Sequence, residues 1–219
     1  MTDPNPNPSW FLGLDVSHYQ GTVDWNSVAQ ERYTFAFIKA TEATSWTDPE
    51  FSANWTGAKA AGLIRGAYHF YDPGSDPEKQ AEHFLGTVWP GGGQPLLEPG
   101  DLPPVLDIET TGGQSAEAVV QGIQIWLSRV GEETLRTPIL YTARGFWDGL
   151  GTTQFGGYPL WVAEYGVAAP TLPAGWQSWC FWQYSQSGRV DGISGPVDLD
   201  IFQGTLQSLQ QMASIPSNS

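Results

Sequence analysis

Short apolar runs alternate with amphipathic stretches along most of the chain, a pattern typical of strands joined by helices. Runs rich in β-branched and aromatic residues predict eight strands, at residues 11–18, 35–42, 63–71, 102–111, 137–144, 158–165, 180–186 and 197–202. Helices are predicted between the early strands, over residues 25–31, 48–62, 76–88 and 115–130, because each stretch has an Asp or Ser suited to cap its first turn. A short amphipathic segment follows residue 204.

This alternation favours parallel strands with right-handed crossovers, and eight strands suggest a closed barrel. The last four strands follow one another too closely for full helices between all of them. We therefore predict an α/β fold, a single irregular (β/α) barrel of eight mainly parallel strands with fewer than eight helices. The barrel is expected to span residues 10–212, between a flexible N-terminal arm of residues 1–9 and a frayed tail of residues 213–219.

The fourth predicted strand, LPPVLDIETT, carries two acids inside an apolar run. On a strand, Asp107 and Glu109 share one face, with their backbones roughly 6–7 Å apart. Burying an acidic side chain among apolar residues costs folding free energy, so such a pair suggests a functional role. Neighbouring carboxylates on a rigid element suit the cleavage of a glycosidic bond. A strand end with solvated or salt-bridged acids explains the pair equally well.

The charge balance limits the partners. With 9 basic and 23 acidic residues the net charge is −14, which argues against nucleic acid and against an anionic membrane surface. No apolar stretch is long enough to cross a membrane. The N-terminus lacks the basic start and apolar core of a secretory signal.

Cysteine and histidine usage narrows the chemistry further. A single cysteine, Cys180, leaves no intramolecular disulfide, and the histidines have no shared ligand spacing. We expect no metal, no cofactor and a monomer. The eleven Trp residues fit core packing and, alternatively, stacking on sugar rings.

Polar and aromatic residues gather where the predicted strands end, and in a β/α barrel the active site lies at those ends. Acids from three strands beside several aromatics predict an acidic, aromatic-lined groove, which favours a glycosidase. The candidates for the substrate groove are Tyr68, Phe70, Tyr141, Trp161, Gln183, Lys39 and Glu42. Core packing explains the aromatic members as readily, and Lys39 with Glu42 can equally form a surface ion pair.

A set of motifs makes the chemistry more specific. Seven motifs resemble those of the glycoside hydrolase family 25 lysozymes, also called the Chalaropsis-type muramidases, and they occur in the same order along the chain. They are GLDVSHYQG (13–21), FIKATE (37–42), GAYHF (66–70), PVLDIE (104–109), LWVAEY (160–165), WQY (182–184) and VDLDIF (197–202). Two positions depart from the family pattern. Asp200 stands where Asn is usual, and Ala43 follows KATE where Gly is common.

The resemblance implies hydrolysis of the β-1,4 bond between N-acetylmuramic acid and N-acetylglucosamine in bacterial cell-wall peptidoglycan. The enzyme would act outside the cell, either secreted or released by a phage. A non-catalytic wall-binding barrel and a chitin-type hydrolase are the alternatives.

Carried over by position, Glu109 is the general acid and Asp107 its partner carboxylate, while Asp15 and Asp198 complete the acidic set. Asp198 is preferred to Asp200. We expect Glu109 to hold a proton beside a second carboxylate and Asp107 to stay ionised. Asp107 then either orients the substrate's acetamido group in a substrate-assisted, retaining route or stabilises charge.

Overall fold

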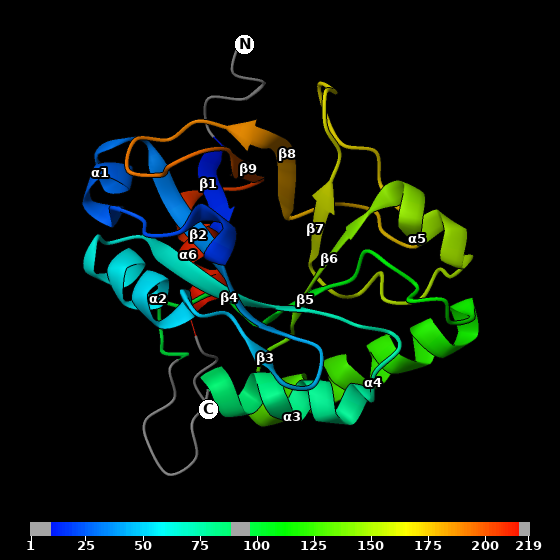
Figure 1. Cartoon of the computed structure of the whole chain (residues 1–219). Helices are drawn as coiled ribbons and strands as arrows, with labels where there is room; N and C mark the ends of the chain where they lie inside the picture. Colours follow the sequence, from blue (N-terminus) through cyan, green and yellow to red (C-terminus); the bar gives the residue numbers. More distant parts are fainter. Residues whose placement is uncertain (1–9, 89–96, 215–219) are drawn as a thin grey trace.

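The computed structural model describes residues 10–88 and 97–214 (Figure 1), so the expected N-terminal arm and most of the expected tail lie outside the described residues. These residues form an eight-stranded closed barrel, whose strands are β1 (Phe11–Val16), β2 (Tyr33–Glu42), β4 (Ile64–Phe70), β5 (Val105–Asp107), β6 (Ile139–Ala143), β7 (Leu160–Ala163), β8 (Phe181–Gly188) and β9 (Val197–Phe202). The short β3 (Trp46–Thr47) pairs with the end of β2 as an antiparallel hairpin.

All neighbours from β1 to β8 around the barrel are parallel. Strand β9 is antiparallel to both β8 and β1 and closes the ring between them. The predicted mainly parallel barrel is therefore confirmed, with one reversed strand.

Helices surround the barrel unevenly. They are α1 (Trp25–Gln30), α2 (Phe51–Ala60), α3 (Pro77–Val88), α4 (Ala116–Thr134), α5 (Arg144–Leu150) and α6 (Leu206–Ala213), with a 3₁₀ turn η1 at His18–Gln20. Figure 1 shows α3 and α4 side by side below the strands. Within the described part of the chain no helix joins β7 to β8 or β8 to β9, so the predicted loss of helices in the last third is confirmed.

Two helix starts show how local sequence acts. Asp24 caps α1 as predicted, because its side chain accepts from the backbone N–H groups of Asn26 and Ser27. Asp48 is not the N-cap of α2. The helix begins at Phe51, and its N-cap is Glu50. One oxygen of the Asp48 carboxylate accepts from the backbone N–H of Glu50, and the other accepts from the backbone and ring of His18, each at 2.9 Å.

The barrel interior is packed with aromatic rings. Alternate residues of a strand share a face, so Phe35 and Phe37 of β2 point inward, and Phe37 stacks on Trp161 with ring centroids 4.2 Å apart. Glycines make room for them. A Cβ at Gly13 would lie 2.3 Å from the Phe35 ring, and one at Gly66 would lie 2.7 Å from the Phe37 ring. This apolar layer forms a floor below the polar residues at the carboxyl ends of the strands.

Candidate active site

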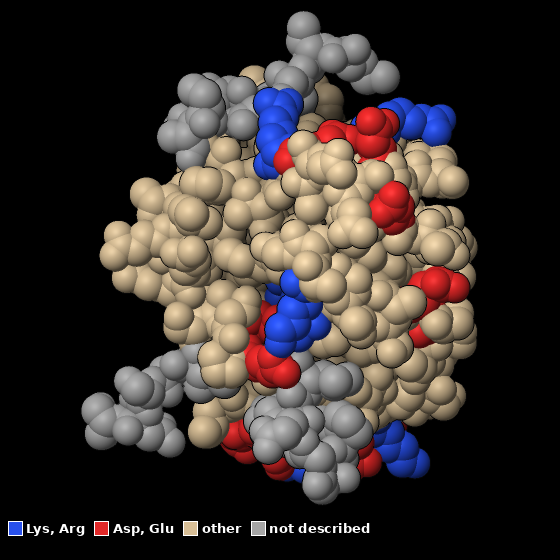
Figure 2. All heavy atoms as spheres, turned by 90° about the vertical axis from the view of Figure 1, so that its left-hand side faces the viewer, with Lys and Arg blue, Asp and Glu red and all other residues tan. Residues whose placement is uncertain are grey.

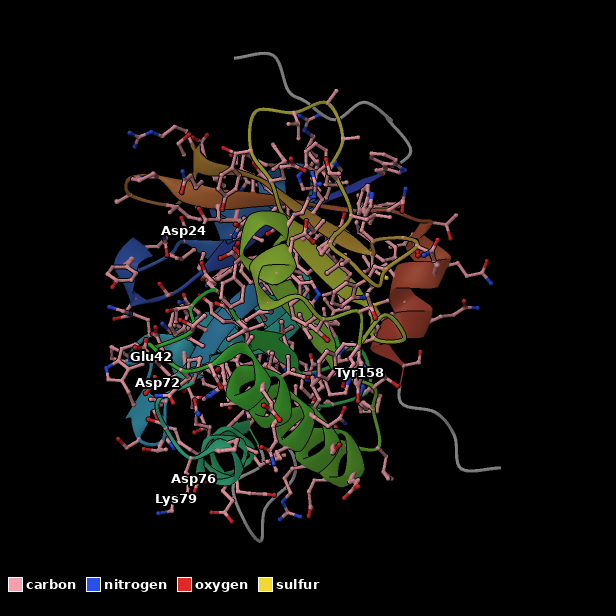
Figure 3. All side chains as sticks on the ribbon, turned by 90° about the vertical axis from the view of Figure 1, so that its right-hand side faces the viewer. Asp24, Glu42, Asp72, Asp76, Lys79 and Tyr158 are labelled. Carbon is pink, nitrogen blue, oxygen red and sulfur yellow. The ribbon has the colours of Figure 1, made fainter. Side chains whose placement is uncertain are left out.

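A cavity of about 200 Å³ opens at the carboxyl ends of the barrel strands. It is lined by Asp15, Ser17, Tyr19, Gln20, Lys39, Tyr68, Phe70, Asp107, Glu109, Tyr141, Trp161, Gln183 and Asp198. The structure thus brings together every predicted site residue except Glu42. Figure 3 places Glu42 and Asp72, at and just beyond the ends of β2 and β4, on the side of the barrel away from Tyr158, which precedes β7.

Glu42 stands just outside this lining. Its carboxylate accepts from Nζ of Lys39 at 2.7 Å. The Glu42 side chain is 42% exposed, whereas that of Lys39 is 7% exposed. The Lys39 ammonium also lies 4.7 Å from the centroid of the Phe70 ring and 5.0 Å from that of Trp46. Lys39 is therefore fixed at the cavity wall by one ion pair and two rings.

The two central acids meet in a way that differs from the prediction. Strand β5 ends at Asp107, and Glu109 lies beyond it in an irregular segment. The backbone N–H of Ile108 still donates to the carbonyl of Tyr141 at 3.1 Å, so the chain stays extended for one more residue. The Asp107 and Glu109 carboxyl groups both line the cavity and lie close enough to affect the protonation of Asp107.

The burial of the two acids affects which of them favours its protonated form. Asp107 is buried and Glu109 is exposed. Burial, followed by repulsion from Glu109, raises the pKa of Asp107 well above its usual value. This direction opposes the expectation that Asp107 stays ionised in the free protein. Its Oδ1 atom is buried without a hydrogen-bond partner among the described residues, which leaves it available to a ligand.

A second acidic wall lies on β1 and β9. The two strands pair so that Asp15 stands opposite Asp198. Asp15 is buried and accepts from Nε2 of Gln183 at 2.7 Å. Burial, then repulsion from Asp198, raises the pKa of Asp15, and burial with repulsion from Glu109 raises that of Asp198 to about 6.

Asp200 is separated from the cavity. It is fully buried, absent from the lining, and accepts from Nε1 of Trp161 at 2.8 Å. Asp198 is thus the strand-β9 acid that reaches the cavity, in line with the preference derived from the sequence.

The aromatic candidates serve packing and lining together. Trp161 is 2% exposed and contacts Phe37 and Tyr141, with the Tyr141 ring centroid at 4.5 Å. The Tyr141 hydroxyl donates to Oε1 of Gln183 at 2.8 Å. These rings are buried core residues that also line the cavity.

Tyr19 and Gln20 line the cavity without having been predicted. They lie in η1, where Ser17 and Gln20 form a reciprocal capping box, and the letters S-H-Y-Q are the signature of that motif. Tyr19 is 81% exposed, and its ring lies 4.2 Å from that of His18. An exposed ring at the mouth of the cavity, backed by a second ring, suits contact with a flat ligand.

The remaining histidine near the strand ends is structural. His69 is fully buried, with Thr41 at 2.7 Å and Gln80 at 3.1 Å from its ring nitrogens. Burial lowers its pKa to about 3, so it stays neutral. It faces the helices rather than the cavity, since it lies against Trp126 of α4.

The described residues contain no group of three or more His, Cys, Asp or Glu side chains placed to hold a metal ion. Within the same ranges no helix is long and apolar enough to cross a membrane. On the face drawn in Figure 2, Lys and Arg form small, separate groups, most of them beside Asp or Glu.

Residues 14–193 match the family described as Glycosyl hydrolases family 25. The chain is 42% identical to "Lysozyme M1" of Streptomyces globisporus over 212 residues, which cover 92% of this chain and 70% of that protein. It is 35% identical to the "N,O-diacetylmuramidase" of Chalaropsis sp, covering 85% of this chain and 95% of that protein. The crystal structure of a bacterial lysozyme from Streptomyces coelicolor superposes with a TM-score of 0.86 at 41% identity, covering 94% of this chain and 98% of that one.

Proposed function

Because the chain belongs to glycosyl hydrolase family 25, we propose that the two acidic walls of its cavity cleave the sugar backbone of peptidoglycan. The protein is a glycoside hydrolase of the lysozyme type, an N-acetylmuramidase. It acts on the β-1,4 bond between N-acetylmuramic acid and N-acetylglucosamine. The roles of the individual side chains follow from where each lies.

Glu109 is the general acid. It is the exposed member of a carboxyl pair in which Asp107 is buried, so it can reach the glycosidic oxygen of a long glycan. In the free enzyme the raised pKa of Asp107 favours the protonated form of that carboxyl group. When the acetamido N–H of the substrate donates to Asp107, the ionised form of Asp107 is favoured and the proton passes to Glu109.

Bond cleavage then proceeds with assistance from the substrate. Glu109 gives its proton to the leaving oxygen as the bond from that oxygen to the anomeric carbon breaks. The acetamido oxygen forms a new bond to the same carbon, giving a cyclic cation that the Asp107 carboxylate stabilises. Water, losing a proton to Glu109, then adds at that carbon and reopens the ring, which restores the starting configuration.

The opposite wall stabilises positive charge. Asp15 and Asp198 face the cavity from β1 and β9, across from the Asp107 and Glu109 pair. Their carboxyl groups favour the cationic transition state over the neutral substrate, which is the condition for lowering a barrier.

The glycan is held by the groove candidates. Tyr68, Phe70, Tyr141, Trp161, Gln183 and Lys39 line the cavity, Glu42 anchors Lys39, and Tyr19 adds a ring at the mouth. We propose that the enzyme acts as a monomer. The substrate lies outside the cell membrane, so the enzyme would reach it by secretion or by release from a phage-infected cell.

The observation that carries the mechanism is that one wall of the cavity bears a buried and an exposed carboxyl group that interact electrostatically. Proton NMR of the first-formed anomer, recorded before mutarotation, tests the route. Retention of the β configuration is expected, and an initial α anomer would show direct attack by water instead. Comparison of purified peptidoglycan with chitin oligomers separates the muramidase from a chitin-type hydrolase.

A further inference from the structure

Asp200 is a carboxyl group that the mechanism leaves without a task. It is 0% exposed and lies on β9 between Gly13 of β1 and Gln183 of β8. Its Oδ1 accepts from Nε1 of Trp161 at 2.8 Å. Its Oδ2 is buried and receives no hydrogen bond from the described residues. A buried carboxylate with an unsatisfied oxygen is costly.

Asp15 lies two residues along β1 from Gly13, which pairs with Asp200, so the two acids share one face of neighbouring strands. Gln183, which pairs with Asp200 on β8, reaches Asp15 with its amide, and the two carboxyl groups affect each other's protonation. An ionised carboxylate cannot donate, so these two groups can bond only when one of them carries a proton. Asp15 already accepts from Gln183 at 2.7 Å, which favours its charged form. Two charged carboxylates side by side in a buried site would repel each other strongly.

We propose that Asp15 and Asp200 share one proton, held on Asp200, and that Asp200 is a positioning residue which donates this proton in a hydrogen bond to Asp15. The Asp15 carboxylate then receives two donors, Gln183 and Asp200, and is held in one orientation toward the cavity. The effect on turnover rests on the proposed function, whereas the shared proton does not.

The groups around the pair agree with this assignment. Asp198 acts on both carboxyls from β9, and Glu109 acts on Asp15 from the segment after β5. Both are acidic and oppose a second negative charge. Gln183 of β8 and Trp161 of β7 supply neutral donors, and Tyr68 of β4 faces Asp15 as a neutral phenol. Burial, then repulsion from Asp15, raises the pKa of Asp200 well above its usual value.

Asp200→Asn tests the proton directly, because an Asn side chain keeps both hydrogen bonds with no proton to titrate. An Asp in the unfolded chain is ionised above about pH 4, so the native wild type must take up one more proton than the variant on folding. Between about pH 5 and 7 the folding equilibrium constant of the wild type should therefore fall, relative to Asp200→Asn, by about tenfold per pH unit. Urea unfolding at several pH values measures this ratio.

Asp191→Asn is the matched control, since it removes an exposed carboxylate and should keep the wild-type pH slope. If Asp200→Asn also keeps that slope, the shared proton does not exist. Should Asp200→Asn fail to fold, Asp200→Ala removes the same titrating group and should give the same loss of slope, and an unchanged slope there overturns the proposal as well.

Turnover separates positioning from mere packing. Asp200→Asn should retain kcat at neutral pH, whereas Asp200→Ala, which leaves Asp15 with one donor, should lose about tenfold in kcat with little change in KM. An equal loss in both variants would contradict positioning by a donated hydrogen bond. If the slope changes as expected but the wild type releases no muramic acid ends, the proton assignment stands and the proposed function fails.

Discussion

Nε2 of Gln183 on β8 donates to Oδ2 of Asp15 on β1 over 2.7 Å, although the two residues are 168 positions apart in the sequence. The other end of the same amide accepts from the hydroxyl of Tyr141 at 2.8 Å and from that of Tyr165. One side chain therefore connects the acidic wall of the cavity to its aromatic wall. Its hydrogen bond orients the Asp15 carboxylate.

Replacing Gln183 by Leu should impair both folding and turnover. The change removes one of the donors to Asp15 and the acceptor of the Tyr141 hydroxyl, which should cost about 1–3 kcal/mol in the free energy of unfolding. We expect kcat to fall by about tenfold, because Asp15 loses its orientation. Urea unfolding and steady-state kinetics measure the two effects. Gln121→Leu on the exposed face of α4 is the control and should alter neither.

Asp198→Asn should make the protein more stable and less active at neutral pH. The pKa of Asp198 is about 6 in the folded protein, above the usual value of about 3.9 in an unfolded chain. The stability linked to this group is therefore fully present below about pH 4 and is lost as pH rises through 6. At pH 7 the variant should gain about 1–2 kcal/mol, after a reduction for the partial exposure of the side chain.

The gain should be mostly lost at pH 4, where Asp198 is protonated in the folded protein and about half protonated in the unfolded chain. Turnover should nevertheless fall, because the cavity loses a negative charge facing the reacting carbon. Denaturant unfolding at pH 4 and 7, together with wall-clearing assays, gives both readouts. If the variant is instead less stable than the wild type at pH 7, the charged form of Asp198 stabilises the fold, which contradicts the prediction.

Tyr19→Ala should weaken substrate binding while leaving the fold intact. The ring is 81% exposed, so its loss removes little packing. If a sugar ring stacks on it, KM for polymeric peptidoglycan should rise by about three- to tenfold, a loss of about 0.5–1.5 kcal/mol. Tyr19→Phe keeps the ring and should behave as wild type. An unchanged KM in the Ala variant would remove Tyr19 from the substrate groove.

Ala43→Gly should stabilise the protein. Ala43 adopts φ +49°, in the left-handed region where a Cβ is strained by about 1–2 kcal/mol. Part of the relief is offset by the larger backbone entropy of Gly in the unfolded chain, so the net gain should be about 0.5–1 kcal/mol in urea unfolding. Ala118→Gly on the exposed face of α4 should instead lose about 1 kcal/mol, and a loss at both positions would contradict the strain.

Much of the barrel could be predicted from the sequence because strand runs and helix caps are local signals. Asp24 and Ser115 cap their helices as predicted. Helix α5 escaped prediction because Ala143 at its N-cap makes no side-chain hydrogen bond, so no capping residue marks its start. Asp48 was misinterpreted as a helix cap because its partner His18 lies 30 residues away, and a long-range pair leaves no trace in local sequence.

The sequence could predict which residues line the cavity, but not which of its acids are buried and have raised pKa values. Asp107 and Glu109 were chosen from their spacing, and both line the cavity. Which of them is buried depends on where β5 ends, and that is decided by the neighbouring strands rather than by the letters D-I-E. The burial of Asp107 and the fully enclosed position of Asp200 are consequences of barrel closure.

The most direct test of the central claim compares the wild type with Glu109→Gln on purified peptidoglycan, with analysis of the sugar ends released. Glu117→Gln on the outside of α4 is the matched control. The wild type and the control should release new reducing ends that carry N-acetylmuramic acid, while Glu109→Gln stays folded and loses at least about 100-fold in rate. Turnover by Glu109→Gln at the wild-type rate, or new reducing ends that carry N-acetylglucosamine, would contradict the account.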